Sequence, residues 1–253
     1  MAQVISFANQ KGGVGKTTSA VNIAAAVGKL GKKVLLVDMD PQGNATSGVG
    51  IAKKSIKSTI YEVLLGQIEP HEAVLQTKYK NLSVIPATMS LSGIEVDFIE
   101  LEKRERRAKM ALDALSEDYD YIMIDCPPTL GMLTINALVA SKGLIIPMQC
   151  EFFALEGLSQ LMYTFKKIRQ NLNPELEITG VLLTMYNSRL VLTTQVVAEL
   201  KKYYADKLFK TPISRSVKLS EAPSYGAPIC YHEPYSKGSL EYNDVAKELM
   251  LRI

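Results

Sequence analysis

A glycine-rich segment near the N-terminus combines the residue types that bind phosphate. It reads Gly12-Gly13-Val14-Gly15-Lys16-Thr17-Thr18, follows an apolar stretch directly and opens a segment of helical character. Glycines let the backbone turn tightly enough for several N–H groups to point into one concavity, and the N-terminus of the following helix adds a positive dipole end. The pattern therefore predicts a loop that cradles the phosphates of a nucleotide.

Three side chains of this loop have distinct expected roles. Lys16 is placed to reach the β- and γ-phosphates as a point charge, and Thr18 is placed to hold the α-phosphate. The Thr17 hydroxyl is placed to ligate Mg²⁺, which keeps most of its waters and takes few protein ligands. A plain strand-to-helix turn is the structural alternative, but Gly-Lys-Thr in register after a strand argues against it.

Carboxylates follow two further apolar segments. Asp38 and Asp40 end one of them, and Asp125 ends the other, just before two prolines. An open α/β fold binds ligands at the carboxyl edge of its strands. Asp125 is therefore expected to hold a water of Mg²⁺, and the prolines to stiffen the loop behind it. For Asp38, and less so for Asp40, the alternative is that the carboxylate only caps a turn or helix.

These residues need a sheet that brings the ends of several strands together. Short aliphatic or β-branched runs alternate with longer helical stretches, which predicts βαβ units around a mostly parallel sheet. The expected strands are 4–8, 34–38, 82–86, 121–125, 144–148 and 178–184, with a weaker one near 208–213. The expected helices are 17–30, 58–65, 104–116, 132–140, 154–172, 193–206 and 239–251. The predicted fold class is α/β, a three-layer, doubly wound P-loop sheet.

Length and composition favour a single domain, 1–253, in a chain of 253 residues that is 47% hydrophobic and 22% charged. No Ser/Gly/Pro-rich linker or internal repeat marks a second domain. Cys126, Cys150 and Cys230 are widely spaced, so they are expected to be reduced packing residues of a cytoplasmic protein without a metal framework. No segment resembles a signal peptide or a membrane span. The net charge of +3 does not by itself indicate nucleic acid.

The loop departs from the standard phosphate-binding pattern in two ways. Gln10 stands where the first glycine is usual, and an additional lysine, Lys11, precedes the paired glycines. Further signatures are Asp38-Met39-Asp40-Pro41-Gln42-Gly43-Asn44 and Ser220-Glu221-Ala222-Pro223. On these residues the chain resembles the ParA/Soj family of partitioning ATPases, which carry a deviant Walker A motif. The resemblance spans essentially the whole chain and implies ATP as the nucleotide, together with Mg²⁺.

The resemblance also implies roles at the phosphate end of the site. In this family the signature lysine, Lys11 here, reaches across a dimer to the ATP of the other subunit. Gly12 would lie where the two subunits close, at a point where a side chain would block their approach. Asp40 would orient or activate the attacking water, with Asp38 near Mg²⁺.

Contacts to the base and to DNA are implied at a second set of positions. For adenine they are Asn187, Ser214 and Ser216, although the chain has Ser-Arg-Ser where the family commonly has Pro-Arg-Asn. For nonspecific double-stranded DNA, which the family binds as ATP-bound dimers, they are Arg189 and Lys218. Other lysine-rich runs of the chain are explained equally well as solvated faces.

The implied function is a DNA-partitioning ATPase. ATP binding would close a homodimer on DNA, and a centromere-binding partner of the ParB/Spo0J type would stimulate hydrolysis and release. The protein would be cytoplasmic and associated with the nucleoid. A membrane is not expected, because the last helix is short and mixed in charge. The cysteine pairs of the superfamily's iron–sulfur members are missing as well.

Two other classes of function remain open at this point. A metabolic amide- or phosphoryl-transferring member of the superfamily, such as a dethiobiotin- or cobyrinate-type synthetase, predicts a second small-molecule pocket and no DNA binding. A nucleotide-gated positioning protein for another cargo predicts ATP-dependent dimers that ignore DNA.

Overall fold

The apolar runs of the chain pair into one sheet. The computed structural model describes residues 1–151 and 154–253. Within these ranges the strands are β1 (Gln3–Phe7), β2 (Val34–Asp38), β3 (Leu75–Gln76), β4 (Leu82–Ile85), β5 (Tyr121–Asp125), β6 (Gly143–Gln149) and β7 (Glu177–Thr184). They form a seven-stranded sheet in the order β3-β4-β2-β5-β1-β6-β7. Every pairing is parallel except that of β3 with β4.

The predicted phosphate loop leaves this sheet at its topological switch point. β1 pairs with β5 on one side and with β6 on the other. The chain passes from β1 across β5 to β2, and later from β5 across β1 to β6, so the crossovers on the two sides of β1 run in opposite directions. In open α/β sheets this arrangement opens a crevice at the carboxyl end of the strand, where ligands bind.

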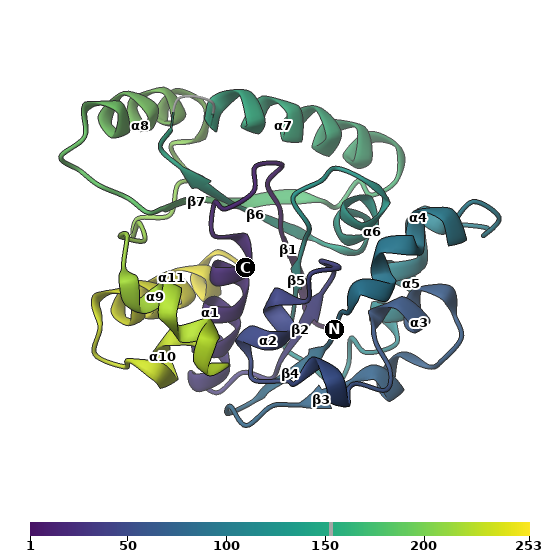
Figure 1. The fold of residues 1–253 in the computed structure, drawn as a ribbon. Coiled ribbons are helices and arrows are strands. Elements are labelled where there is room, and N and C mark those ends of the chain that lie inside the picture. The colour runs from purple at the N-terminus through teal and green to yellow at the C-terminus, as the bar shows by residue number, and fades with distance from the viewer. Residues whose placement is uncertain (152–153) are drawn as a thin grey trace.

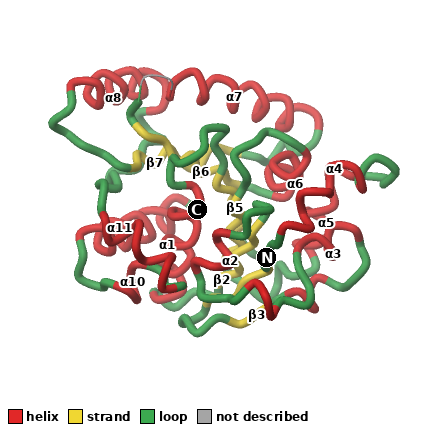
Figure 2. Tube along the Cα trace, viewed as in Figure 1, coloured by secondary structure: helices red, strands yellow, loops and turns green. Residues whose placement is uncertain are grey.

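Helices cover both faces of the sheet. They are α1 (Lys16–Lys29), α2 (Asn44–Gly48), α3 (Ile60–Leu65), α4 (Ile94–Asp97), α5 (Arg107–Asp113), α6 (Met132–Ala140), α7 (Ala154–Asn171), α8 (Val191–Tyr204), α9 (Val217–Glu221), α10 (Ile229–His232) and α11 (Lys237–Arg252). Figure 1 shows α1, α10 and α11 on one side of the sheet and α6 and α7 on the other. Figure 2 shows the yellow strands between these two sets of red helices.

Side chains that alternate along each strand fill the two hydrophobic cores, one on each face of the sheet. In β2, Val34 and Leu36 pack in the cluster beneath α1 and α11, whereas Leu35 and Val37 pack in the cluster beneath α3 to α8. All of these residues are buried. Strands that are apolar on both faces are typical of a parallel sheet covered by helices. The three-layer, doubly wound α/β fold predicted from the sequence is therefore confirmed.

Helix α1 lies close to the sheet because its inner face carries small residues. Ala20, Ala24 and Gly28 are buried along that face. A Cβ added at Gly28 would lie 2.6 Å from the carbonyl oxygen of Lys80, far inside van der Waals contact. The small residues therefore let the C-terminal end of α1 lie directly against the turn that precedes β4.

The strand expected near 208–213 is wrong. Leu208 makes only an isolated bridge to Val181 of β7. The N–H groups of Phe209 and Ile213 donate to the carbonyls of Val181 and Leu183. The pairing does not continue as a ladder, because the two donors are four residues apart and their acceptors on β7 only two, so the segment bulges away from β7 between them.

Very short elements escaped the sequence analysis. They are β3, α2, α4, α9 and α10, each of two to five residues. A segment of that length is too short for a hydrophobic period to develop, so periodicity has no signal there. Within the two described ranges, no helix combines the length and the apolar character needed to cross a membrane.

Candidate nucleotide-binding site

The predicted phosphate loop joins β1 to α1 with the backbone that its glycines allow. Gly13 has a φ of 73° and Gly15 a φ of 83°, both in the left-handed region that favours glycine. Gly15 is the N-cap of α1, so the unpaired N–H groups of the first turn face the loop. The hydroxyl of Thr184, at the end of β7, donates to the carbonyl of Val14 at 2.8 Å. Contacts to two strands therefore shape the loop without any nucleotide.

Lys16, the first residue of α1, points over this loop and is only 6% exposed. Its Nζ donates to the carbonyl oxygen of Lys11 at 3.0 Å. Burial lowers the pKa of Lys16, while the negative charges of Asp125 and Asp40 oppose that shift. The ammonium group thus sits at the concavity with a carbonyl partner that a phosphate oxygen can replace.

Asp125, the last residue of β5, is fully buried. Neither of its carboxylate oxygens has a hydrogen-bond partner in the described part of the chain. Burial raises the pKa of Asp125 well above its ordinary value, and the neighbouring Asp38 adds to the shift. The nearby Thr17 hydroxyl and the charge of Lys16 act in the opposite direction.

An unpaired buried carboxylate is costly, and a divalent cation beside it removes that cost. The Asp125 carboxylate and the Thr17 hydroxyl therefore fit Mg²⁺ chemically. Among the described residues, no three His, Cys, Asp or Glu side chains form a metal cage of their own. Mg²⁺ needs few protein ligands, because water and the phosphates of its nucleotide supply most of its coordination.

Asp38 ends β2 and is the register partner of Asp125 on β5. Its Oδ2 accepts from the N–H and the hydroxyl of Thr46, at 2.8 and 2.7 Å. Its Oδ1 accepts from the N–H of Asp40 at 3.1 Å. Burial raises the pKa of Asp38 to about 6. Asp38 therefore lies beside Asp125, and both of its oxygens are engaged in organising the following loop, which is the capping alternative.

Asp40 is 7% exposed and has a freer carboxylate. Its Oδ1 accepts from the N–H of Gln42 at 2.9 Å, and Oδ2 accepts no hydrogen bond from the described residues. The turn is closed by the N–H of Gly43, which donates to the Asp40 carbonyl at 2.8 Å. One oxygen of Asp40 is therefore available to a water molecule near the phosphates, the position that a water-orienting group needs.

A cavity of about 300 Å³ adjoins the loop on its β7 side. It is lined by Gly15 and Thr18 of the loop, by Thr184, Met185, Ile213, Ser214, Arg215, Ser216, Leu219, Ser220 and Pro223, and by Tyr242 of α11. A hollow that combines apolar side chains such as Met185, Ile213 and Leu219 with polar ones, beside a phosphate site, suits a nucleoside.

Two of the three predicted adenine residues, Ser214 and Ser216, line this cavity. Ser214, however, gives both its N–H and its hydroxyl to the carboxylate of Glu241, at 2.8 and 2.6 Å. It therefore has no donor left for a base. Asn187 borders an adjacent surface hollow instead, where its side-chain oxygen accepts from the N–H of Arg189 at 3.0 Å.

The two residues expected at a subunit boundary lie at the rim of the site. Lys11 forms an ion pair with Glu151, just past β6, and so points away from its own phosphate loop. Gly12 is exposed, and a Cβ added there would meet only the Cβ of Pro128, at 4.0 Å. Packing within the chain therefore leaves room for a side chain at position 12.

The two predicted DNA-contacting residues differ in their surroundings. Arg189 is exposed, and its guanidinium forms no ion pair with any acid in the described ranges. The Nζ of Lys218 lies 3.2 Å from Glu233 and 3.5 Å from Glu221. These carboxylates, Glu233 foremost, raise the pKa of Lys218. Arg189 offers a free cation, whereas Lys218 is already partly neutralised.

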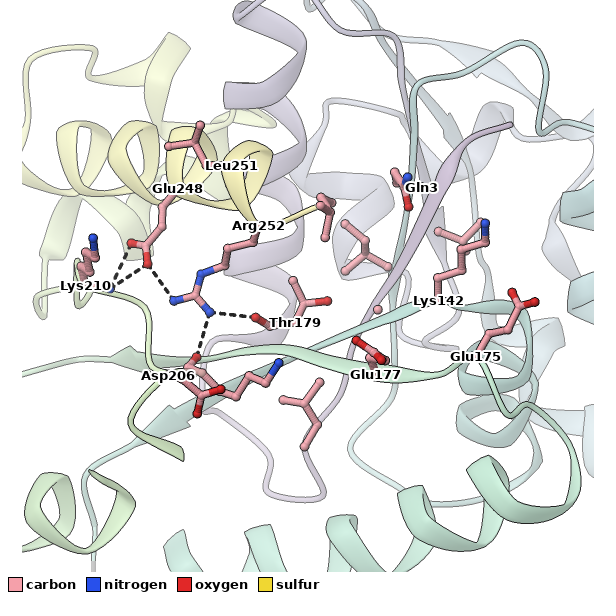
Figure 3. Close-up of a pocket in the computed structure, with 16 residues that line it drawn as sticks. Gln3, Lys142, Glu175, Glu177, Thr179, Asp206, Lys210, Glu248, Leu251 and Arg252 are labelled. Carbon is pink, nitrogen blue, oxygen red and sulfur yellow. Dashed lines mark hydrogen bonds and ion pairs between the residues drawn. The ribbon is translucent and has the colours of Figure 1, made fainter. Parts of the chain in front are cut away.

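A second cavity, of about 540 Å³, lies at the opposite edge of the sheet (Figure 3). It is bordered by the first residues of β1, β6 and β7 and by the end of α11. There Arg252 donates to the carbonyls of Thr179 and Lys207, at 2.8 and 3.1 Å, and pairs with Glu248 at 2.7 Å. The five residues of β1 separate this cavity from the phosphate loop by roughly 16 Å.

Sequence reasoning missed the residues that hold the site together from outside. They are Thr46, Glu151, Thr184 and Glu241. Thr184 had a signal, because it ends an expected strand at the carboxyl edge of the sheet. Glu151 and Glu241 had none, because they are two of 26 acidic residues and their partners are remote in sequence.

Comparisons with known proteins agree with this geometry. A family model described as an AAA domain matches residues 2–178. The sporulation initiation inhibitor protein Soj of Bacillus subtilis is 52% identical over 249 residues, which are 98% of each chain. The chromosome partitioning protein ParA of Myxococcus xanthus is 48% identical over 252 residues, 100% of this chain and 89% of that protein. Cobyrinic acid a,c-diamide synthase of Mycobacterium smegmatis, crystallised with an ATP analogue and magnesium, is 36% identical with a TM-score of 0.88, over 99% of this chain and 94% of that one.

Proposed function

This chain belongs to the ParA/Soj family of chromosome-partitioning ATPases, and we propose that ATP binding closes two copies of it into a sandwich dimer on nonspecific double-stranded DNA. Hydrolysis then opens the dimer and releases the DNA. The whole chain, 1–253, acts as one ATPase domain, and a centromere-binding protein of the ParB/Spo0J type stimulates hydrolysis through a basic N-terminal segment. The DNA in question is the nucleoid, which gives the protein its location in the cell.

The observation that carries the proposal is the rim of the phosphate loop. An exposed glycine, Gly12, stands beside Lys11, whose side chain pairs with Glu151 and not with its own phosphate loop. Lys11 is held by Glu151 through an ion pair in which both side chains are about half or one-third exposed, and such pairs contribute little free energy. Lys11 can therefore leave Glu151 and bind a phosphate of the ATP in a second subunit with little loss of free energy.

Hydrolysis needs a polarised phosphate and a correctly held water. Lys16 and the N–H groups at the start of α1 receive the β- and γ-phosphates, and Lys11 of the partner copy adds a second cation. Asp125 and Thr17 hold Mg²⁺, which when bound neutralises charge on these phosphates. Asp40 orients the attacking water through its free oxygen, while Asp38 fixes the loop that carries Asp40.

The amide-transferring alternative predicts a second pocket beside the phosphate loop. A synthetase must bring its acceptor substrate next to the activated phosphate, within a few ångströms. The cavity of about 540 Å³ at the far edge of the sheet cannot serve that purpose, whereas a hollow of about 420 Å³ adjoins Thr17 and Thr18, so the cavities are compatible with this alternative. The chromosome partitioning protein ParA of Myxococcus xanthus, at 48% identity, is however more similar to this chain than the synthetase, at 36%.

The deciding experiment measures duplex binding in four states: without nucleotide, with ADP, with ATP and with a non-hydrolysable ATP analogue, each with Mg²⁺. We expect affinity for random-sequence DNA only in the last two states, with release as ATP is consumed. ATP-dependent dimers that ignore DNA would instead support a positioning protein for another cargo. Equal binding in all four states would contradict the proposed coupling.

A variant separates binding from hydrolysis. Asp40→Ala should bind ATP, dimerise and hold DNA, but hydrolyse ATP roughly 100-fold more slowly, because a positioned acid–base group contributes about that factor. Phosphate release is measured alongside light scattering. Hydrolysis at the parental rate would exclude Asp40 as the water-orienting group.

A further inference from the structure

We propose that Glu241 of α11 is a positioning residue for the nucleoside half of ATP, and that it sets the affinity for the base without touching the nucleotide. The inference rests on the proposed nucleotide site. It assigns a role to a residue of the C-terminal helix, outside the residues 2–178 that the family model matches.

Glu241 holds the base-side wall through two short hydrogen bonds. Its Oε2 accepts from the N–H of Ser214 at 2.8 Å, and its Oε1 accepts from the Ser214 hydroxyl at 2.6 Å. The Glu241 side chain is only 12% exposed, and its one cationic neighbour among the described residues is Lys237, at 3.7 Å. A nearly buried carboxylate that accepts two hydrogen bonds from a single residue is a strong local restraint.

The next residue of α11 ties the same wall to the phosphate loop. Tyr242 is fully buried, lines the base-side cavity and shares a 3.1 Å hydrogen bond with the hydroxyl of Ser19. Ser19 lies one turn into α1, just after the loop lysine. Consecutive residues of a helix point about 100° apart. Glu241 can therefore bind Ser214 of the 214–216 segment while Tyr242 binds Ser19 of α1.

The consequence is a fixed distance between the base-side wall and the phosphate-binding loop. The backbone of the wall segment is also joined to the sheet side, by the bridge of Tyr186 with Ser214 and by the N–H of Ile213, which donates to the carbonyl of Leu183 at 2.8 Å. Glu241 adds a side-chain restraint to these backbone contacts. Without Glu241, the N–H and the hydroxyl of Ser214 lose their acceptor, and the segment is no longer fixed to α11. The cavity should then fit the nucleoside less well, whereas the phosphate loop keeps its own contacts to Thr184 and Lys11.

The test compares two ligands that share phosphates and differ in the nucleoside. The probes are Mg·ADP and Mg·tripolyphosphate, titrated calorimetrically into the full chain. Glu241→Ala should weaken Mg·ADP roughly tenfold, the scale of one hydrogen bond to a charged group, and should change tripolyphosphate binding by less than about twofold. Glu241→Gln keeps an acceptor for the Ser214 N–H and should restore Mg·ADP binding to within about threefold. In turnover, KM for ATP should rise with kcat nearly unchanged.

Glu248→Ala is the matched control. Glu248 also lies on α11, is 15% exposed, and accepts from a backbone N–H, that of Lys210, and from Arg252. Its loss should lower thermal stability about as much as the loss of Glu241, with parental Mg·ADP affinity. An equal loss of affinity in Glu248→Ala, or parental affinity in Glu241→Ala, would overturn the positioning role.

Two further variants keep the test decisive. If Glu241→Ala does not fold, Ser214→Ala removes only the hydroxyl bond and should weaken Mg·ADP about threefold; parental affinity there would overturn the proposal. Lys16→Ala should abolish tripolyphosphate binding. If it does not, the phosphate site itself is misplaced, a failure of the proposed function that is separate from that of Glu241.

Discussion

At the scale of single residues, the nucleotide site contains a buried carboxylate, that of Asp125, which lowers the stability of the folded chain. Asp38 has every oxygen bonded to Thr46 or to the following loop. Asp125, one strand away, is equally buried, and neither of its oxygens accepts a geometric hydrogen bond in the described part of the chain, where only the nearby Thr17 hydroxyl and the charge of Lys16 favour its ionised form. A buried carboxylate without partners destabilises the folded chain. Such groups persist at sites where a ligand needs them.

Replacing Asp125 should therefore raise the stability of the nucleotide-free protein and remove its response to Mg²⁺. Asp125→Asn should raise the thermal midpoint of the nucleotide-free protein by about 2–6 °C, because it removes a buried charge worth on the order of 1–2 kcal/mol. The additional stabilisation that Mg²⁺ gives to the ADP complex should disappear. Thermal unfolding with and without ADP and Mg²⁺ measures both effects.

The control for this variant is Asp113→Asn. Asp113 lies on α5, is 62% exposed and pairs only with Lys109. Its loss should change stability by less than about 0.5 kcal/mol and leave the Mg²⁺ effect intact. A less stable Asp125→Asn protein would show that the carboxylate is satisfied in solution by a group other than Mg²⁺.

At the scale of elements, the sequence predicted the strands and helices that are long enough to show a hydrophobic pattern. The strands around the switch point were expected from apolar runs, and the phosphate loop from glycines between a strand and a helix. The failure at 208–213 arose because the run is apolar enough for a strand, but two additional residues between Phe209 and Ile213 break its register with β7. Such a mismatch depends on the partner strand, and the apolar character of the run alone does not indicate it.

The candidate site was predictable to a similar extent and for similar reasons. Residues whose roles depend on backbone position were predictable, such as Lys16 at the start of a helix and Asp125 at the end of a strand. Residues that act through a partner do not. Glu241 and Ser214 are 27 positions apart, and nothing local in either segment indicates the bond between them. The sequence also cannot show that Asp38 is already saturated.

The close packing of α1 makes a prediction at this scale. Gly28→Ala should destabilise the protein by roughly 1–3 kcal/mol, because the new Cβ lies 2.6 Å from the carbonyl oxygen of Lys80 and the helix must shift. The gain in helix propensity, about 1 kcal/mol, opposes but does not cancel that strain. Urea denaturation measures the change.

Gly157→Ala is the matched helical control. Gly157 lies within α7, and a Cβ added there meets nothing within 4 Å. The same substitution should therefore stabilise the protein by about 0.4–1 kcal/mol. A stabilised Gly28→Ala protein would mean that α1 does not press on the 80–81 turn as closely as the structure indicates.

At the scale of the whole molecule, the proposed dimer should depend on the exposed glycine at the rim. Gly12→Val should fold and bind ATP like the parent, because a side chain there has room beside Pro128. It should fail to dimerise, since the branched side chain would stand between the two closing subunits. Light scattering with ATP distinguishes the two states. An ATP-induced dimer of Gly12→Val would remove Gly12 from the interface.

Nonspecific DNA binding depends on how many free cations the dimer presents. Each phosphate contact adds roughly −0.9 to the slope of log affinity against log salt, so a residue present twice in a dimer accounts for about −1.8. Arg189 is unpaired within the described ranges, whereas Lys218 must leave Glu221 and Glu233 before it can bind a phosphate.

Charge substitutions at these two residues should therefore have unequal effects. Arg189→Ala should reduce the magnitude of the salt slope by about 1.8, and Arg189→Glu should abolish binding while ATP-dependent dimerisation continues. Lys218→Ala should weaken binding and reduce the slope by a smaller amount, because part of its charge is already neutralised. Glu233→Gln, the matched control, should strengthen binding by freeing Lys218.

Fluorescence anisotropy over a salt series measures the DNA affinity of all four variants. Tight duplex binding by Arg189→Glu dimers would exclude Arg189 from the DNA-binding surface, and an equal loss in Arg189→Ala and Lys218→Ala would show that the two carboxylates exert no restraint on Lys218.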